Sequence, residues 1–394
     1  MEVCKKRTRG CGSSSAEDRL SSLPDVLLHA ILSSLKARQL VQTSVLSRRW
    51  RSLWRSVPCL SIDQGEFQSN PGNISQTELA KFEDFVDFLL LRNDVPALNS
   101  FCLYMTEGYP IRIDFARWIR RALNCPLEAL HIQSVSFCRV KLPPDLGSSS
   151  HCLKRLHLCH VSLGKKFAEL INYVCVVLED LELKECELFR ECGRYDNSIA
   201  SSSLRNLIID DGFIGGNRMI ITAPQLASLH LIIGLFNMTI LLKEMPSLVK
   251  ASICFKLPPD AIDCIDQLKL LSNVLNVTSL ELSGLFEMVL PDAEPVEFPT
   301  FENLRSLLLD QCDLSNNFQL LCHFLGSSPN LERLTVRCCK LPEGSAGDEG
   351  MGRLKKLKST EIIYEDGDNI QELVCFLLVV SDRVLKNTIR LTKV

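Results

Sequence analysis

Residues 153–163 read LKRLHLCHVSL, and this short stretch decides the fold of the chain. The same Leu-x-x-Leu-x-Leu spacing returns as LEDLELKECEL at 178–188, LRSLLLDQCDL at 304–314 and LERLTVRCCKL at 331–341. The second and third leucines of each copy are two residues apart, as in a short strand that buries one face. Because a single unit cannot cover its own apolar side, stacked units are expected to form one parallel sheet over a continuous leucine ladder.

The repeat extends over most of the chain at intervals of 22 to 29 residues. Its clear copies start at Leu127, Leu153, Leu178, Leu204, Leu226, Leu304 and Leu331, and weaker copies start at Leu98, Leu248, Val277 and Leu357. Eight positions after the first leucine, some units carry a cysteine: Cys186, Cys312 and Cys339. A small side chain at this position is expected to fill the bend that follows the strand.

The segments between the expected strands read mostly as helices, which would cover the outer, convex side of the sheet. Apolar residues follow helical spacing in 114–123, 167–180, 260–274 and 316–330, and also in 81–94, ahead of the clear repeats. Three other segments are rich in Gly, Pro, Ser, Asn or acidic residues and are expected to be irregular connections. These are residues 61–76, 189–203 and 287–300.

The composition is that of an ordinary globular protein, with 23% charged and 46% hydrophobic residues among 394. The net charge of −3 provides no global field for nucleic acid or an anionic membrane. No apolar run is long enough to span a membrane, and the first twenty residues lack the apolar core of a secretory leader. We therefore expect an intracellular protein, in the nucleus or the cytoplasm or both. The basic cluster at Lys5, Lys6, Arg7 and Arg9 is either a solvated tail or a nuclear-import signal.

The chain contains no pattern that predicts catalysis or a cofactor. Its 18 cysteines include no Cys-x-x-Cys pair. The densest His/Cys cluster, at 151–160, interleaves with leucines of one strand, so its members should point to both faces and hold no metal. No phosphate-binding glycine loop or activated nucleophile is evident. We expect a protein that is not an enzyme and needs no cofactor.

Residues 18–60, DRLSSLPDVLLHAILSSLKARQLVQTSVLSRRWRSLWRSVPCL, differ from the repeats. Their apolar residues recur three and four apart, and Pro24 stands where the first helix begins. Three short helices are too few to bury all of these side chains by themselves. The surplus apolar surface is therefore expected to meet another part of the protein or a partner.

This stretch resembles an F-box, the adaptor-docking motif of cullin-based ubiquitin ligases. The matching elements are Leu23-Pro24-Asp25, Ile31-Leu32 and the closing run from Val45 to Trp50, with Leu53 and Trp54. Residues 357–394 resemble part of the FBD module. Together with the repeats, these features resemble the plant class of F-box/leucine-rich-repeat proteins.

The resemblance implies a substrate-recognition subunit of an SCF-type ubiquitin ligase that takes part in protein ubiquitination without catalysing it. The F-box would dock on a Skp-family adaptor, and through it a cullin, while the repeats hold an unidentified target protein. Two alternatives stay open: a leucine-rich-repeat scaffold outside any ligase, and a small-molecule co-receptor within the same complex.

The expected architecture is α/β, with a three-helix F-box followed by a leucine-rich-repeat solenoid. Its parallel strands would line the concave side, and mostly helices would line the convex side. The expected divisions are a disordered tail (1–17), the F-box (18–60), a linker and helix (61–97), the repeats (98–356) and an FBD-like cap (357–394).

Two sets of residues are expected to bind partners. The adaptor set, some of which must form the F-box core, is Leu23, Pro24, Leu27, Ile31, Leu32, Leu46, Trp50, Leu53 and Trp54, with Pro24 and the tryptophans as the likelier contacts. The target-binding set consists of side chains that flank the buried leucines: Arg155, His157, Asp180, Glu182, Lys184, Asp210, Arg333 and Arg337. Its charge is expected to change from acidic near the middle to basic at Arg333 and Arg337.

Overall fold

The computed structural model describes most of the chain. The described residues are 20, 22–70, 74–106, 115–135, 140–143, 148–164, 166–188, 197–210, 219–234, 240–243, 245–256, 264–285, 298–342, 356–365, 370–380 and 387–393. The expected N-terminal tail and its basic cluster lie outside these ranges, as does most of the expected loop at 287–300.

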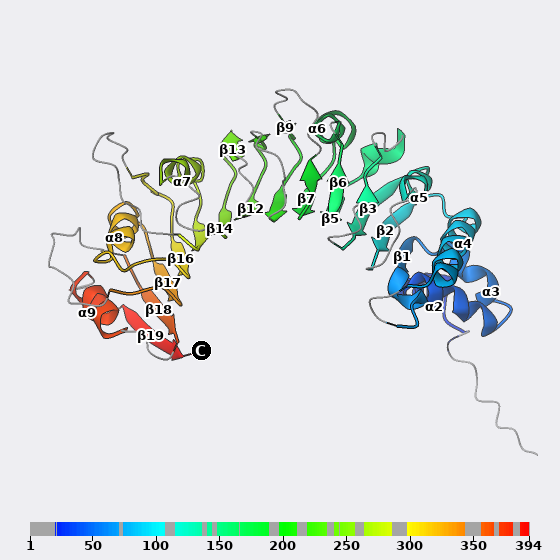
Figure 1. Cartoon of the computed structure of the whole chain (residues 1–394), viewed down its shortest axis with the longest axis horizontal. Helices are drawn as coiled ribbons and strands as arrows, with labels where there is room; N and C mark the ends of the chain where they lie inside the picture. Colours follow the sequence, from blue (N-terminus) through cyan, green and yellow to red (C-terminus); the bar gives the residue numbers. More distant parts are fainter. Residues whose placement is uncertain are drawn as a thin grey trace, which may run out of the picture.

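A single parallel sheet of thirteen strands runs through the described chain, in the order β1-β2-β3-β5-β7-β10-β12-β14-β15-β16-β17-β18-β19. Its strands are β1 (Cys59–Asp63), β2 (Leu98–Tyr104), β3 (Leu127–Gln133), β5 (Arg155–Cys159), β7 (Asp180–Lys184), β10 (Asn206–Asp210), β12 (Ser228–Ile233), β14 (Lys250–Phe255), β15 (Ser279–Ser283), β16 (Ser306–Asp310), β17 (Arg333–Arg337), β18 (Ser359–Tyr364) and β19 (Thr388–Lys393). Figure 1 shows that the strands line the inner side of an arch. The fold is thus the leucine-rich-repeat solenoid that the sequence predicts.

The leucine ladder forms the core of this solenoid. The first residue of every expected repeat, clear or weak, is at most 3% exposed. Within each strand the buried and partly exposed residues alternate, as in the iBiBi pattern of β7, β15 and β16. This confirms that the two-residue period of the leucines sets the strand register.

Helices cover much of the convex side, as predicted. They are α5 (Phe115–Ala122), α6 (Phe167–Glu169) continuing as a π-helical turn (Leu170–Val174), α7 (Cys264–Leu271) and α8 (Gln319–Gly326). Residues 148–152 form a 3-10 turn ahead of β5. Because the π-helical turn ends at Val174, the helix expected over 167–180 is shorter than its apolar spacing suggests.

Two small parallel sheets lie outside the main sheet, and in the repeats that start at Leu178, Leu204 and Leu226 short strands take the place of the helices of other repeats. One small parallel sheet joins β9 (Asn197–Ala200), β11 (Met219–Thr222) and β13 (Ile240–Lys243). A second joins β4 (Val140–Lys141), β6 (Val161–Leu163) and β8 (Glu187–Leu188). The expectation of an irregular loop at 189–203 is wrong where it includes β9. The repeats that start at Leu204 and Leu226 are only 22 residues long, which leaves little length for a helix.

The residue just after several strands has a left-handed backbone. His160, Glu185, Gly284, Gln311 and Cys338 have φ between 45° and 65°. Each donates its backbone N–H to the end of the next strand, for example Glu185 N to Asp210 O at 2.8 Å. The left-handed residue thus turns the chain out of one strand while binding it to the following repeat.

The three repeat cysteines occupy the bend after this turn. Cys186 Sγ donates to Leu158 O (3.3 Å) and Lys184 O (3.4 Å), and Cys312 and Cys339 make the corresponding pairs of contacts. Burial raises the pKa of the Cys186 thiol to about 12, so it stays protonated. The predicted structural role of these cysteines is confirmed.

The N-terminal helices run directly into the sheet. They are α1 (Asp25–Leu32), α2 (Ala37–Gln42), the 3-10 turn η1 (Thr43–Val45), α3 (Trp50–Leu53) and the 3-10 turn η2 (Trp54–Ser56). Strand β1 follows within three residues and pairs with β2. The segment expected to be a linker therefore begins as the first strand of the solenoid and continues as η3 (Gln64–Phe67).

Helix α4 (Gln76–Arg92) confirms the amphipathic helix predicted at 81–94 and begins five residues earlier. Ser75 and Glu78 form a capping box at its first turn, which fixes that start. At its other end, Asp94 N donates to Arg55 O, so α4 packs beside the last turn of the helical region.

The opposite end of the arch contains the strand–helix–strand unit predicted from the sequence. Strands β18 and β19 flank helix α9 (Ile370–Val380) and extend the same parallel sheet. Strand β19 is the outermost strand of the described sheet, and most of its residues are exposed. The division of the chain into domains stays a prediction, since one sheet crosses three of the expected boundaries.

Candidate functional site

The Leu-Pro opening of the N-terminal helices is held by an arginine from the closing motif. Arg49 Nη2 donates to Leu23 O at 2.7 Å and also to the Asp25 carboxylate. Pro24 precedes α1, and its carbonyl accepts from Leu27 N and Leu28 N. His29 Nε2 and Ser56 Oγ lie 2.9 Å apart, which ties α1 to η2. Each of these side-chain contacts joins two residues that are 24, 26 or 27 positions apart in the sequence. Together they hold the opening and the close of the motif in one unit.

Burial divides the expected adaptor-binding residues into two groups. Leu32, Trp50, Leu53 and Trp54 are 0%, 5%, 6% and 4% exposed, and they belong to the continuous hydrophobic core. Leu23 packs partly against that core. The two tryptophans, expected as adaptor contacts, are buried in the free chain, and their part in adaptor binding stays a prediction.

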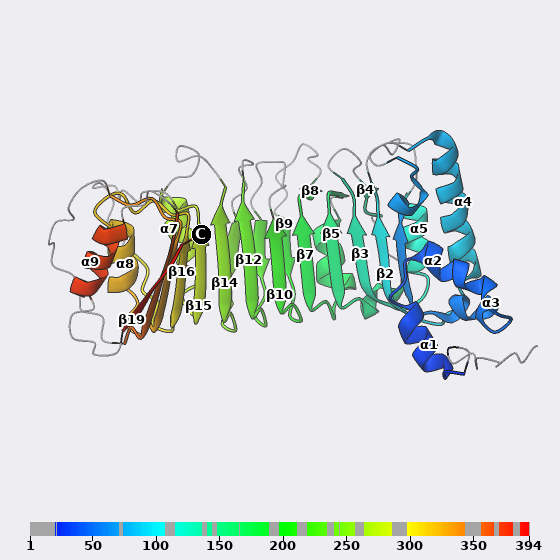
Figure 2. The same cartoon turned by 90° about the horizontal axis from the view of Figure 1, so that it is seen from below.

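The other expected residues face solvent. Leu27 is 51% exposed, Ile31 44% and Leu46 63%, and Pro24 is exposed beside them in the chain. Leu27 and Ile31 are four residues apart on α1 and therefore share one helix face. Figure 2 shows α1 projecting beyond the starts of the strands, where a partner can reach that face.

Sequence reasoning left two prominent apolar side chains out of the expected set. Val26 is 78% exposed and Val45 is 85% exposed, more than any other large apolar residue of the described chain. Val26 does not follow the helical spacing of the buried residues Leu28 and Leu32 on α1. This difference in the sequence could have predicted its exposure. We name Val26, Leu27, Ile31, Val45 and Leu46 the F-box apolar surface.

A network of contacts fixes these helices to the start of the sheet. Lys36 Nζ donates to Asp63 Oδ2 at the end of β1, and this hydrogen bond raises the pKa of the lysine. Arg38 donates to Glu66 O and lies 4.9 Å from the centre of the Phe67 ring. The helices and the solenoid are thus joined by side chains as well as by the chain itself.

The concave face carries three rows of side chains that alternate with the buried leucines. The entry row, at the strand starts, contains Arg155, Asp180, Asn206, Ser228, Lys250, Ser279, Ser306 and Arg333 as successive register partners. The middle row contains His131, His157, Glu182, Ile208, His230, Ser252, Glu281, Leu308 and Thr335. The exit row contains Cys159, Lys184, Asp210, Ile232, Cys254, Ser283, Asp310 and Arg337. All eight residues of the expected target-binding set therefore lie on this face.

Most charges of the middle and exit rows neutralise one another. Glu182 Oε1 lies 2.5 Å from Lys184 Nζ, and its other oxygen lies 3.5 Å from His157 Nδ1. Asp210 Oδ1 lies 3.6 Å from Lys256 Nζ. Such exposed pairs add little stability, but they leave little net charge for a partner to meet.

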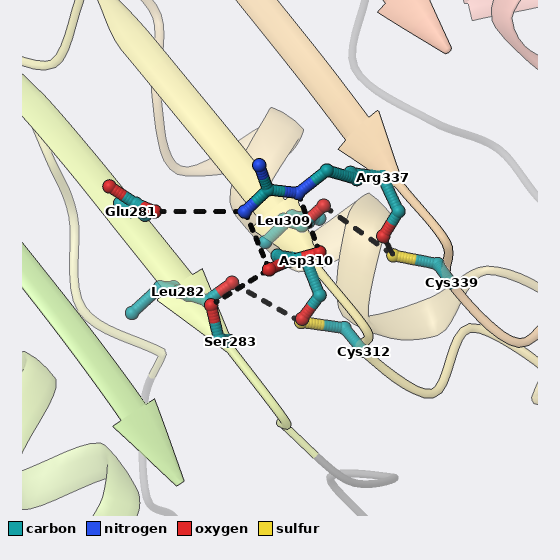
Figure 3. Close-up of polar contacts among 8 residues, drawn as sticks. All are labelled: Glu281, Leu282, Ser283, Leu309, Asp310, Cys312, Arg337 and Cys339. Carbon is teal, nitrogen blue, oxygen red and sulfur yellow. Dashed lines mark hydrogen bonds and ion pairs between the residues drawn. The ribbon is translucent and has the colours of Figure 1, made fainter. Parts of the chain in front are cut away.

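Asp310 and Arg337 form the best-defined of these pairs. Arg337 Nε donates to Asp310 Oδ1 at 2.8 Å and Nη2 to Oδ2 at 2.7 Å, and Glu281 lies 4.0 Å away (Figure 3). The bidentate geometry fixes the guanidinium plane. The expectation of a basic end at Arg333 and Arg337 is thus wrong for Arg337, whose charge Asp310 balances.

Two histidine rings at the other end of the middle row lie edge to face, and the Tyr104 ring of the neighbouring strand is tilted against the first of them. The His131 ring centre lies 5.2 Å from that of Tyr104 and 5.8 Å from that of His157. Burial, and then the charge of His157, lowers the pKa of His131, while Glu182 opposes the shift. The folded state therefore favours neutral His131.

Acidification should destabilise the chain partly through His131. Because its folded pKa is depressed, the unfolded chain binds the proton more readily, and stability falls as the pH drops through about 6.5. We expect His131→Gln to lose less stability than the wild type between about pH 7.5 and 5.5. Urea midpoints at the two pH values measure this, with the exposed His151→Gln as control. An equal loss in wild type and His131→Gln would contradict the prediction.

The described residues contain no group of three or more His, Cys, Asp or Glu side chains placed to hold a metal ion. No helix within them is long and apolar enough to cross a membrane.

The comparisons with known proteins agree with this architecture. The F-box domain model matches residues 20–61. The meiotic F-box protein MOF of Oryza sativa subsp. japonica is 32% identical, over 91% of this chain and 82% of its own length. A putative FBD-associated F-box protein of Arabidopsis thaliana is 29% identical, over 81% of this chain and 80% of that protein. F-box/LRR-repeat protein 13 of Arabidopsis thaliana is 27% identical, over 86% and 80%. The chain belongs to the plant family of F-box proteins with leucine-rich repeats.

Proposed function

We propose that this chain is a substrate-recognition subunit of an SCF-type ubiquitin ligase. In this role the F-box docks on a Skp-family adaptor and through it on a cullin, and the solenoid holds a target protein for ubiquitination. The chain itself is not the catalyst. A nuclear or cytoplasmic location goes with this role.

The observation that carries the proposal is the F-box apolar surface. Five large aliphatic side chains on α1 and around η1 are between 44% and 85% exposed. A large apolar patch left open on a soluble domain usually marks an interaction site, and Leu27 and Ile31 share one face of α1. The family match places the F-box motif on the same residues.

The exposure of each side chain suggests which of the expected residues contact the adaptor and which support those contacts. We propose Leu23, Pro24, Leu27, Ile31 and Leu46 as adaptor contacts, together with Val26 and Val45. Leu32, Trp50, Leu53 and Trp54 would act as supports that hold α1 and η1 in place. The Arg49 contacts to Leu23 O and Asp25 would fix the start of α1.

The target-binding role falls to the concave face. The candidate target-binding residues on this face are Arg155, His157, Asp180, Glu182, Lys184, Asp210, Arg333 and Arg337. They lie on β5, β7, β10 and β17, four strands of one continuous sheet of thirteen, which offers an extended surface. Such a surface suits a protein partner, and charge complementarity would act through the entry row, since most charges of the middle and exit rows are paired.

Co-expression with a Skp-family adaptor tests the adaptor role. We expect a one-to-one complex that stays together through affinity purification and size-exclusion chromatography. A folded chain that elutes without the adaptor under gentle conditions would instead favour the scaffold alternative, in which the F-box only packs on the first repeat. A shift of the melting temperature by a small molecule would favour a co-receptor.

A further inference from the structure

Three cations gather on one part of the concave face without a close ion pair among the described residues, although Glu332 interacts electrostatically with Arg305 and Arg333. Lys250 and Arg333 belong to the entry row, and Arg305 directly precedes Ser306 of the same row. None of the three cations forms an ion pair with another described residue, in contrast to Lys184 and Arg337. Between Lys250 and Arg333, the entry row carries only the hydroxyls of Ser279 and Ser306.

A polar hollow of about 230 Å³ lies at the same edge of the sheet. It is lined by Thr278, Glu302, Asn303, Arg305, Asn330, Glu332 and Lys356. Each of Thr278, Arg305 and Glu332 directly precedes an entry-row residue, so the hollow adjoins the row. We name Lys250, Ser279, Arg305, Ser306, Arg333 and Lys356 the entry-edge basic surface.

Positive charge exceeds negative charge in this region. Lys358 Nζ lies 2.9 Å from Glu332 and neutralises one of the two acids that line the hollow. The other acid, Glu302, lines the hollow together with Arg305 and Lys356. Lys356 Nζ donates to Asn330 Oδ1, and Asn330 Nδ2 donates to Glu302 O, so the lysine is held beside the hollow.

We propose that the entry-edge basic surface binds an extended acidic segment of the target protein. The inference rests on the proposed function in taking that partner to be the target. Carboxylates of the segment pair with Lys250, Arg305 and Arg333, and the serine hydroxyls and asparagine amides bind its backbone.

The spacing of the cations fits an extended peptide that crosses the strands. Lys250 and Arg333 are three strands apart by register, which is about 14 Å at roughly 4.8 Å per strand. An extended chain advances about 3.4 Å per residue, so this separation corresponds to about four residues. Acidic residues four apart would therefore meet both cations, whereas a single small anion could meet only one.

Fluorescence anisotropy with labelled peptides tests this inference on the full chain. The probe is a 13-residue Gly/Ser peptide with Glu at every fourth position, and the comparison peptide has Gln at those positions. We expect the wild type to bind the Glu peptide about tenfold more tightly than the Gln peptide at low salt, and added salt to weaken it. Arg305→Glu with Arg333→Glu should reduce that affinity about tenfold or more.

Matched variants separate a defined site from general electrostatics. Lys154→Glu with Arg205→Glu makes the same charge change at the Arg305-equivalent position of two distant repeats and should keep wild-type affinity. If the reversed pair does not fold, Arg305→Gln with Arg333→Gln replaces it. The proposal is overturned by absence of peptide binding, by equal losses in both double variants, or by full displacement of the peptide by millimolar inorganic phosphate. Adaptor capture is measured on the same samples, so failure of the F-box role registers separately.

Discussion

Leu27→Gln combined with Ile31→Gln is expected to abolish capture of a Skp-family adaptor and to leave the melting temperature of the chain unchanged. Both side chains are about half exposed on one face of α1, so their loss removes little of the protein's own core. Buried apolar anchors at an interface commonly contribute about 2 kcal/mol each, so the pair should weaken docking by about a thousandfold. Glutamine is a good helix former, which keeps α1 intact.

The contrast with the buried tryptophan makes the prediction specific. Trp50→Ala should reduce adaptor capture and also destabilise the F-box, because Trp50 is 5% exposed in its core. Tyr173→Gln with Val176→Gln changes two exposed apolar residues on the convex side and should affect neither property. Undiminished capture by the Leu27/Ile31 variant, measured by pull-down beside its thermal melt, would refute a docking role for α1.

Trp118→Ala is expected to destabilise the junction between the F-box and the solenoid by about 3–5 kcal/mol. Trp118 is fully buried on α5, and its ring meets those of Phe82 on α4 and Phe115 at 5.7 and 5.8 Å. Its Nε1 donates to Asp87 Oδ1 at 2.8 Å. Truncation therefore leaves a cavity and removes a hydrogen bond to a carboxylate of α4.

Urea unfolding followed by far-UV circular dichroism measures this effect. Trp118→Phe keeps most of the apolar volume and should cost less than the alanine variant. Tyr173→Ala, at a side chain that is 77% exposed, provides the control and should unfold like the wild type. A Trp118→Ala midpoint equal to that of the control would show that α5 does not support the junction.

The sequence predicted the solenoid because its leucines carry the information locally. A side-chain period of two fixes which residues of each strand are buried, and an interval of 22 to 29 residues fixes how the units stack. The cysteines at 186, 312 and 339 were predictable for the same reason, since they hold a constant offset from the first leucine. Helix α4 was equally clear from its apolar face.

Other features depend on contacts that spacing does not encode. Apolar residues in 197–222 can form either a helix or a strand. Pairing between the corresponding segments of neighbouring repeats makes them the strands β9 and β11. Trp54, for example, lies beside Phe88 of α4, with 5.9 Å between the ring centres, and no spacing in the sequence links these two residues. The neutralisation of Arg337 requires Asp310 of the preceding repeat, 27 residues earlier.

Strand β1 has a mechanical consequence. It follows the last F-box helix within three residues, pairs with β2 along its whole length, and is anchored by Lys36. The F-box helices and the sheet therefore form one rigid unit, without a flexible linker between them. If the chain works as proposed, the vector from adaptor to captured target is set by the curvature of the arch. The position of each target lysine relative to the adaptor would then decide whether it is modified. Inserting or deleting one repeat should therefore change which lysines are modified, even when target affinity is unchanged.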